Sequence, residues 1–241
     1  MKSLNSLLIT TSNKLDSDAY ETGVWLESLA ASYFILKDGG EFITIASPQG
    51  GQVPHDSKSL SATEHTEYTI RFQQDSQAMY HLSHSLPLNE VKAGDFDLVL
   101  LAGGYGAMWD FADNEQLKQI LEDFNLQNKP IGLVGHAVVA LGSLKMNTGE
   151  PFVKNRKITA FSNSEEELAG WREHSSFALE SKLIALGALY SKGAVTSSYV
   201  VVDNNIITGQ NPASSVETAK QVLAFAHRKQ TIEIANSNKS I

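Results

Sequence analysis

The chain has 241 residues, of which 42% are hydrophobic and 19% are charged, and it contains no cysteine. The missing cysteine excludes a thiolate nucleophile, a disulfide and any cysteine-ligated metal centre. The formal net charge of -8 disfavours contact with phosphate backbones, so we expect no nucleic-acid partner. The apolar run from Leu7 to Ile9 is too short for a signal peptide or a membrane span. We therefore expect a cytoplasmic protein that engages no membrane.

The first residues of the chain predict a strand, a helix and a second strand. Residues 6–11 form a buried strand, and residues 22–37 place apolar side chains on one helical face before Gly39 and Gly40. Residues 42–46 predict the next strand, so the order is typical of a βαβ unit. Residues 49–95 are polar and weakly periodic, and they predict a loop-rich excursion with one or two short helices.

The rest of the chain continues this alternation of strands and helices. Strands are predicted at residues 96–101, 131–134 and 157–161, a hairpin at 199–208, and helices at 117–124, 137–144, 179–186 and from about 212 onward. Asp113 or Asn114 can cap the helix at 117–124. The pattern predicts a three-layer αβα sandwich with a mostly parallel, flavodoxin-like central sheet. We expect one domain over residues 1–228 and a frayed polar tail over residues 229–241.

Two strand ends carry candidate site residues, because sites in such sheets gather at the carboxyl ends of strands. Gly103 and Gly104 follow one strand. There they either leave backbone N–H groups free to face an anion or form only a tight turn. Gly135 and His136 follow the next strand in the strand–turn–helix order of a nucleophile elbow. His136 is then either a site residue or a buried, hydrogen-bonded histidine.

A third strand end carries the acidic run Ser162 to Glu167. Ser164 and Glu167 fit a capping box, and a first helical turn favours acids for electrostatic reasons. A functional acid is the alternative, if a histidine lies nearby. Aromatic residues close to these strand ends can wall a pocket or serve only as packing; they are Tyr105, Trp109 and Trp171. His81 and His84 are three apart with no third ligand in evidence, so we expect no metal.

These pieces together resemble the DJ-1/PfpI superfamily, which has the class I glutamine amidotransferase fold. The resemblance is closest to its HchA-like branch of stress-inducible chaperones and glutathione-independent glyoxalases. It rests on five stretches in order along nearly the whole chain, namely Thr22–Glu27, Ala46–Gly51, Ala102–Phe111, Lys129–His136 and Ile207–Ser214.

The resemblance also implies a catalytic site from which two groups are missing. The family has a cysteine at the elbow, where this chain has Gly135, and a glutamate on the first helix, where this chain has Ser28. Glu27 lies about 100° around that helix and is expected to point elsewhere. Glu166 stands where the branch keeps the acid that orients the histidine. The oxyanion and pocket residues implied are Gly103, Gly104, Tyr105, Trp109 and Ala137.

Three functions stay open at this point. The first is a degenerate protein that acts by binding a small carbonyl compound or unfolded client proteins, as a homodimer and without a cofactor. The second is a hydrolase or lyase for a small carbonyl or amide substrate, in which His136 and Glu166 activate water. The third is a non-thiol version of the family reaction that converts methylglyoxal to lactate. Loss of a nucleophile lowers the rate of such reactions by several orders of magnitude.

Overall fold

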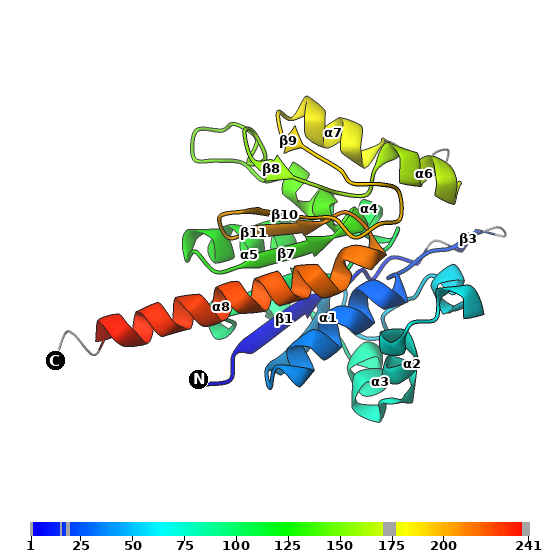
Figure 1. Cartoon of the computed structure of the whole chain (residues 1–241), viewed down its shortest axis with the longest axis horizontal. Coiled ribbons are helices and arrows are strands. Elements are labelled where there is room, and N and C mark those ends of the chain that lie inside the picture. The colour runs from blue at the N-terminus through cyan, green and yellow to red at the C-terminus, as the bar shows by residue number, and fades with distance from the viewer. Residues whose placement is uncertain (1, 15, 18–19, 171–176, 238–241) are drawn as a thin grey trace.

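A computed structural model describes residues 2–14, 16–17, 20–170 and 177–237. Its centre is a seven-stranded sheet in the order β10-β11-β7-β6-β1-β4-β5 (Figure 1). All neighbouring pairs are parallel except β10 and β11, which form the predicted hairpin. β6 and β7, which precede the two glycine-containing strand ends, lie side by side with Leu101 opposite Leu133.

The strands are β1 (Asn5–Ile9), β2 (Asp16–Ser17), β3 (Tyr20–Glu21), β4 (Phe42–Ser47), β5 (Leu86–Pro87), β6 (Leu98–Leu101), β7 (Ile131–Val134), β8 (Lys157–Ile158), β9 (Leu189–Tyr190), β10 (Val200–Asp203) and β11 (Ile206–Gly209). The α-helices are α1 (Leu26–Asp38), α2 (Glu67–Gln74), α3 (Ser76–Ser83), α4 (Ala107–Asp110), α5 (Glu115–Leu126), α6 (Asn163–Ala169), α7 (Leu179–Ala185) and α8 (Ser215–Ser237).

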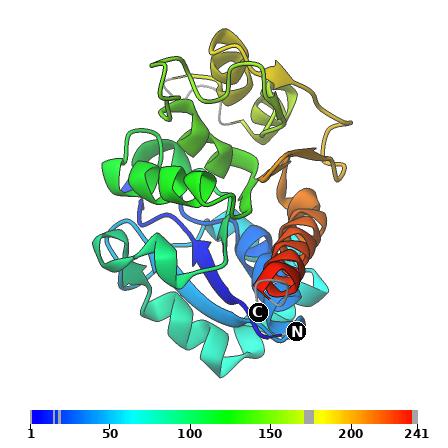
Figure 2. The same ribbon diagram turned by 90° about the vertical axis from the view of Figure 1, so that its left-hand side faces the viewer.

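The helices cover both faces of the sheet and give the predicted three layers. α1 and α8 pack against one face and against each other, while α4, α5 and a 3-10 helix, η5 (Gly135–Gly142), cover the other face. The residues of β6 and β7 are fully buried, as central parallel strands between two helical layers require. β8, β9, α6 and α7 form a lobe beyond the sheet, at the top of Figures 1 and 2.

Several predicted elements are confirmed, and three differ from the prediction. Asn114 caps α5 by accepting a hydrogen bond from the N–H of Leu117 at 2.9 Å, as one of the two predicted caps. The predicted strand at 157–161 is only β8, which pairs with β9 outside the central sheet. The predicted helix at 137–144 is a 3-10 helix that already begins at Gly135.

The expected frayed tail is also wrong for its described part, because α8 continues to Ser237. Lys229 donates a hydrogen bond to the carbonyl oxygen of Gln127, and Gln230 donates one to that of Lys2. These bonds anchor the polar helix to the body of the protein.

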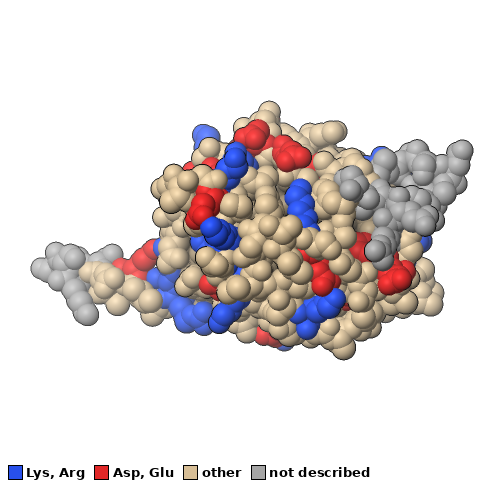
Figure 3. Space-filling view, turned by 90° about the horizontal axis from the view of Figure 1, so that it is seen from above, with Lys and Arg blue, Asp and Glu red and all other residues tan. Residues whose placement is uncertain are grey.

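The visible surface carries charges of both signs in small, interspersed groups (Figure 3). Arg71 and Asp38 form a double hydrogen-bonded ion pair, with distances of 2.6 and 2.7 Å, on the exposed side of α1 and α2. Within the part of the chain that the structure describes, no helix is long and apolar enough to cross a bilayer.

Candidate functional site

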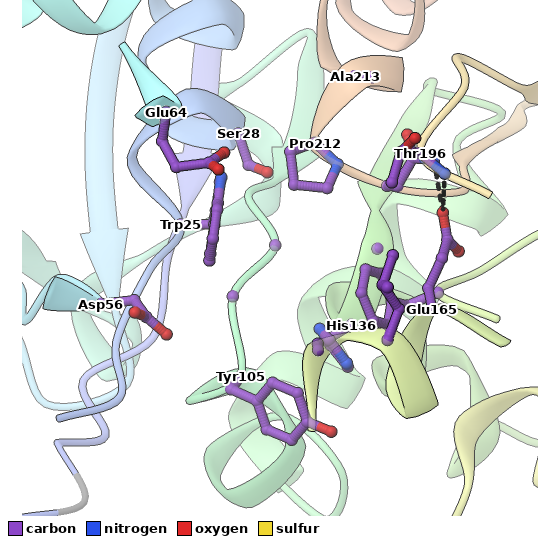
Figure 4. Close-up of a pocket in the computed structure, with 17 residues that line it drawn as sticks. Trp25, Ser28, Asp56, Glu64, Tyr105, His136, Glu165, Thr196, Pro212 and Ala213 are labelled. Carbon is purple, nitrogen blue, oxygen red and sulfur yellow. Dashed lines mark hydrogen bonds between the residues drawn. The ribbon is translucent and has the colours of Figure 1, made fainter. Parts of the chain in front are cut away.

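A cavity of about 340 Å³ opens at the carboxyl ends of β6, β7 and β11 (Figure 4). Its volume is within the range of small-molecule sites. Trp25 and Ser28 lie on one side of the cavity, and His136, Glu165 and Thr196 lie on the other. The cavity therefore occupies the edge of the sheet where the glycine-rich strand ends meet, as the sequence predicted.

Gly135 forms the predicted elbow after β7. Its φ angle of +57° lies in the left-handed region that L-residues avoid. A Cβ atom built at this position meets nothing closer than the carbonyl oxygen of Gln210 at 3.9 Å and the Cα of Asn211 at 4.0 Å. The elbow thus keeps the strained backbone of a nucleophile position, together with open space where a side chain would project.

Gly103 and Gly104 form the second strand end, and here no side chain fits. A Cβ at Gly103 would lie 2.5 Å from the carbonyl oxygen of Val134, and one at Gly104 would lie 2.3 Å from that of Gly23. The carbonyl oxygen of Gly103 accepts a hydrogen bond from the N–H of Trp25 at 2.9 Å. These glycines allow the turn after β6 to pass closely between the elbow and the start of α1.

The structure brings His136 and Glu166 together, as the resemblance implied. Nε2 of His136 lies 2.9 Å from Oε1 of Glu166, and the hydroxyl of Tyr105 donates to the other carboxyl oxygen. His136 is sandwiched between the rings of Tyr105 and Phe161, both with centroids 4.3 Å away. Nδ1 of His136 makes no hydrogen bond to a described residue, and the imidazole lines the cavity.

α6 begins earlier than predicted, and this start places Glu166 beside His136. The capping box consists of Ser162 and Glu165 rather than Ser164 and Glu167, so the prediction was two residues too late. Glu165 accepts hydrogen bonds from the Ser162 side chain and backbone, from the N–H of Thr196 and from the amide of Asn211. These contacts hold α6 against the loop before β10 and fix the direction of the next side chain, Glu166.

Burial controls the protonation of the His136–Glu166 pair. Desolvation lowers the pKa of His136 to about 3 and raises the pKa of Glu166 to about 8. At neutral pH one proton therefore lies in the Oε1–Nε2 hydrogen bond, either on the carboxyl group or on the imidazole. In both arrangements Nδ1 also carries a proton. The pair thus presents an N–H donor to the cavity until the pH exceeds about 8.

The helix position where the family resemblance implied a glutamate is occupied by a buried hydroxyl. Ser28 lines the cavity, is 1% exposed, and its Oγ has no hydrogen-bond partner among the described residues. The prediction that Glu27 points elsewhere is confirmed, because its carboxylate accepts a hydrogen bond from Thr66 at the start of α2. Glu27 therefore does not supply the acid that the resemblance implied at this position.

The structure places some predicted pocket residues outside the cavity. Gly103, Gly104 and Tyr105 line it, but the described lining does not include Trp109 or Ala137. Trp109 packs behind Tyr105, with ring centroids 6.0 Å apart, and the Ala137 side chain is buried in the core. Neither residue therefore lies in the described lining of the cavity, in contrast to the prediction. Trp171 lies outside the described residues.

Glu165 belongs to the acidic run that the sequence offered as a source of a functional acid. Several other lining residues were not singled out from the sequence; they are Trp25, Asp56, Glu64, Phe161, Leu168, Ala169, Thr196, Asn211, Pro212 and Ala213. Trp25 and Asn211 belong to stretches that carried the family resemblance, which was the available signal. Asp56 and Glu64 come from the weakly periodic excursion, where no pattern indicated a site. Among the residues that the structure describes, no three His, Asp or Glu side chains gather closely enough to hold a metal ion.

A strand-to-helix elbow beside a histidine–acid pair, on a sheet of this topology, defines an α/β protein of the class I glutamine amidotransferase-like type. The sequence model of the DJ-1/PfpI family matches residues 31–225, and the chain belongs to that family. The predicted resemblance and fold class are thereby confirmed.

Three similar proteins support the assignment to this family. The solved structure of the Rapid Encystment Protein 24 KDa of Francisella tularensis is 33% identical, covers 92% of this chain and 99% of its own, and superposes with a TM-score of 0.87. A glutathione-independent glyoxalase of Schizosaccharomyces pombe is 26% identical over 86% of this chain and 88% of its own length. A glutamine amidotransferase-like class 1 domain-containing protein of Bos taurus is also 26% identical, over 79% of this chain and 83% of its own. The glyoxalase relative agrees with the predicted HchA-like branch.

Proposed function

We propose that this protein binds a small carbonyl compound without covalent chemistry, in the cavity between α1 and the elbow. The observation that carries the proposal is the combination of Gly135, which supplies no nucleophile, with the His136 imidazole that lines the cavity. Its Nδ1 is an N–H donor as long as the His136–Glu166 pair holds its shared proton. A carbonyl oxygen accepts hydrogen bonds and so complements that donor. The similarity to a glutathione-independent glyoxalase of Schizosaccharomyces pombe supports a carbonyl compound as the ligand.

The test separates binding from turnover. Hydroxyacetone is titrated into isotope-labelled protein, and backbone amide shifts of Gly103, Gly104 and Gly135 are followed by NMR. We expect saturable shifts with a Kd of about 1 mM, which corresponds to roughly -4 kcal/mol. In parallel, methylglyoxal is supplied and lactate is measured. Without a thiolate, we expect lactate to form no faster than in buffer.

Two histidine variants provide the comparison. His136→Ala removes the donor and is expected to abolish the saturable shifts. His84→Ala changes an exposed histidine that stacks on Tyr80, and it is expected to leave binding unchanged. Multiple turnovers of methylglyoxal by the wild-type protein, or full binding by His136→Ala, contradict the proposal.

Water activation by His136 is a second candidate, favoured by the 2.9 Å contact with Glu166. A general base needs an unprotonated nitrogen, and Nδ1 loses its proton only when the pair gives up its shared proton. Any hydrolytic activity is therefore expected to rise above pH 8, where the pKa of Glu166 lies. A pH–rate profile that peaks near pH 6, or that survives His136→Ala, excludes this candidate.

A further inference from the structure

The inner wall of the cavity contains a polar atom whose hydrogen-bonding capacity is not used. Oγ of Ser28 is buried and has no partner among the described residues, although buried hydroxyls normally find one. Ser32, one turn further along α1, is equally buried and donates to the carbonyl oxygen of Ser28 at 2.7 Å. The helix backbone thus accepts a hydrogen bond from Ser32, whereas the hydroxyl of Ser28, which lines the cavity, has no partner among the described residues.

Ser28 is close to the elbow. Its Oγ lies 3.5 Å from the point where a Cβ of Gly103 would be, and that point is 2.5 Å from the carbonyl oxygen of Val134, the residue before Gly135. Figure 4 shows Ser28 between Trp25 and Pro212, facing the cavity. A ligand that reaches from His136 across the side-chain-free elbow therefore arrives at this hydroxyl.

The charge of the lining restricts what that ligand can be. The described lining residues include the carboxyl groups of Asp56, Glu64 and Glu165, but no lysine or arginine. Figure 4 places Asp56 and Glu64 on the same side as Ser28. A carboxylate or phosphate in this space would be desolvated beside acids without a compensating cation, which is strongly unfavourable. An uncharged hydroxyl group exchanges hydrogen bonds with Ser28 without this cost.

We infer that Ser28 is a specificity-determining residue that binds the hydroxyl group of an uncharged hydroxy-carbonyl compound, and that the cavity rejects the corresponding carboxylates. This inference rests on the proposed function, since the carbonyl group of the same ligand is held by His136. The carbonyl and the hydroxyl then occupy opposite ends of the space that the missing cysteine and glutamate side chains leave.

Three probes of equal carbon number test the inference on the full-length protein. Hydroxyacetone carries both groups, acetone lacks the hydroxyl, and pyruvate carries a carboxylate in its place. NMR titrations give a Kd for each probe with the wild type, Ser28→Ala and the control variant Ser32→Ala. In the wild type we expect hydroxyacetone to bind about 5- to 10-fold more tightly than acetone, a difference of roughly 1–1.4 kcal/mol. Pyruvate is expected to bind more weakly than both.

The variants decide whether Ser28 causes this preference. Ser28→Ala is expected to bind hydroxyacetone and acetone equally, with acetone affinity as in the wild type, while Ser32→Ala retains the preference. Thermal melting should show no loss of stability for Ser28→Ala, because its Oγ has no partner to lose. Equal binding of hydroxyacetone and acetone by the wild type, or a preference that survives Ser28→Ala, overturns the inference but not the proposed function. If no probe binds the wild type, both fail.

Discussion

Two glycines of the site have positive φ angles, and alanine is expected to affect them very differently. Gly135 has a φ of +57° and open space at its Cβ position. Gly104 has a φ of +143° and backbone atoms at 2.3 and 2.5 Å from its Cβ position, which belong to Gly23 and Trp25. We predict that Gly135→Ala yields a folded protein with a small loss of stability, whereas Gly104→Ala severely disturbs the turn.

The expected magnitudes follow from these environments. A left-handed backbone costs an L-residue about 1–2 kcal/mol, and replacing glycine returns roughly 0.4–1 kcal/mol through the lower entropy of the unfolded chain. Gly135→Ala should therefore lower the free energy of unfolding by at most about 1.6 kcal/mol, and Tm by at most roughly 6 °C. At Gly104 the side chain must displace backbone, so the loss should exceed about 3 kcal/mol.

Thermal melting followed by circular dichroism, together with urea unfolding, measures both variants. Gly135→Cys should match Gly135→Ala in stability, because the same open space accepts a sulfur atom, and its single thiol makes incorporation easy to verify. If Gly135→Ala lowers the stability as much as Gly104→Ala does, the elbow does not have the open space at its Cβ position that the structure shows.

Three further predictions concern the acids of the site. In the folded protein the His136–Glu166 pair holds one shared proton between about pH 3 and pH 8, whereas in the unfolded chain the glutamate titrates at 4.5 and the histidine at 6.5. The contribution of the pair to the free energy of unfolding should therefore be largest between pH 4.5 and 6.5. Outside this window it should fall by at most about 1.4 kcal/mol per pH unit. Urea unfolding across pH measures this, and Glu166→Gln should remove the decline on the alkaline side. Glu165→Ala should cost more than about 3 kcal/mol because it leaves buried donors unpaired, while the exposed neighbour variant Glu167→Ala should be nearly neutral; similar melting curves for the two would contradict the bracing role of Glu165. Tyr105→Phe removes a hydrogen bond to the Glu166 carboxyl group and should raise the pKa of Glu166, so hydroxyacetone binding should persist to higher pH than in the wild type.

The sequence was sufficient to predict the sheet and the strand ends that form the site. Runs such as Leu98–Leu101 and Ile131–Val134 are apolar on both faces, and the glycines after them mark the turns. The start of α6 could not be predicted in the same way, because Ser162 and Ser164 each have a glutamate three residues later. The choice between them depends on Thr196 and Asn211, which contact Glu165 from distant parts of the chain.

The helical tail and the walls of the cavity also could not be predicted from local sequence patterns. Residues 229–237 have no apolar face to predict a packed helix, and the hydrogen bonds that support their helix join them to Gln127 and Lys2. Trp109 and Ala137 follow the glycine turns in sequence, but the described lining of the cavity does not include them. The expected homodimer, client proteins and cytoplasmic location stay predictions.

The glycine at the elbow also determines how the site responds to oxidants. A family member with a thiolate at this position can be oxidised by peroxide or alkylated by electrophiles. In this chain no cysteine is present at any position, so neither reagent finds a thiolate in the cavity. Ligand occupancy should then depend on ligand concentration and pH, and the protein should keep its binding capacity under oxidative conditions that would inactivate a protein with a thiolate at this position.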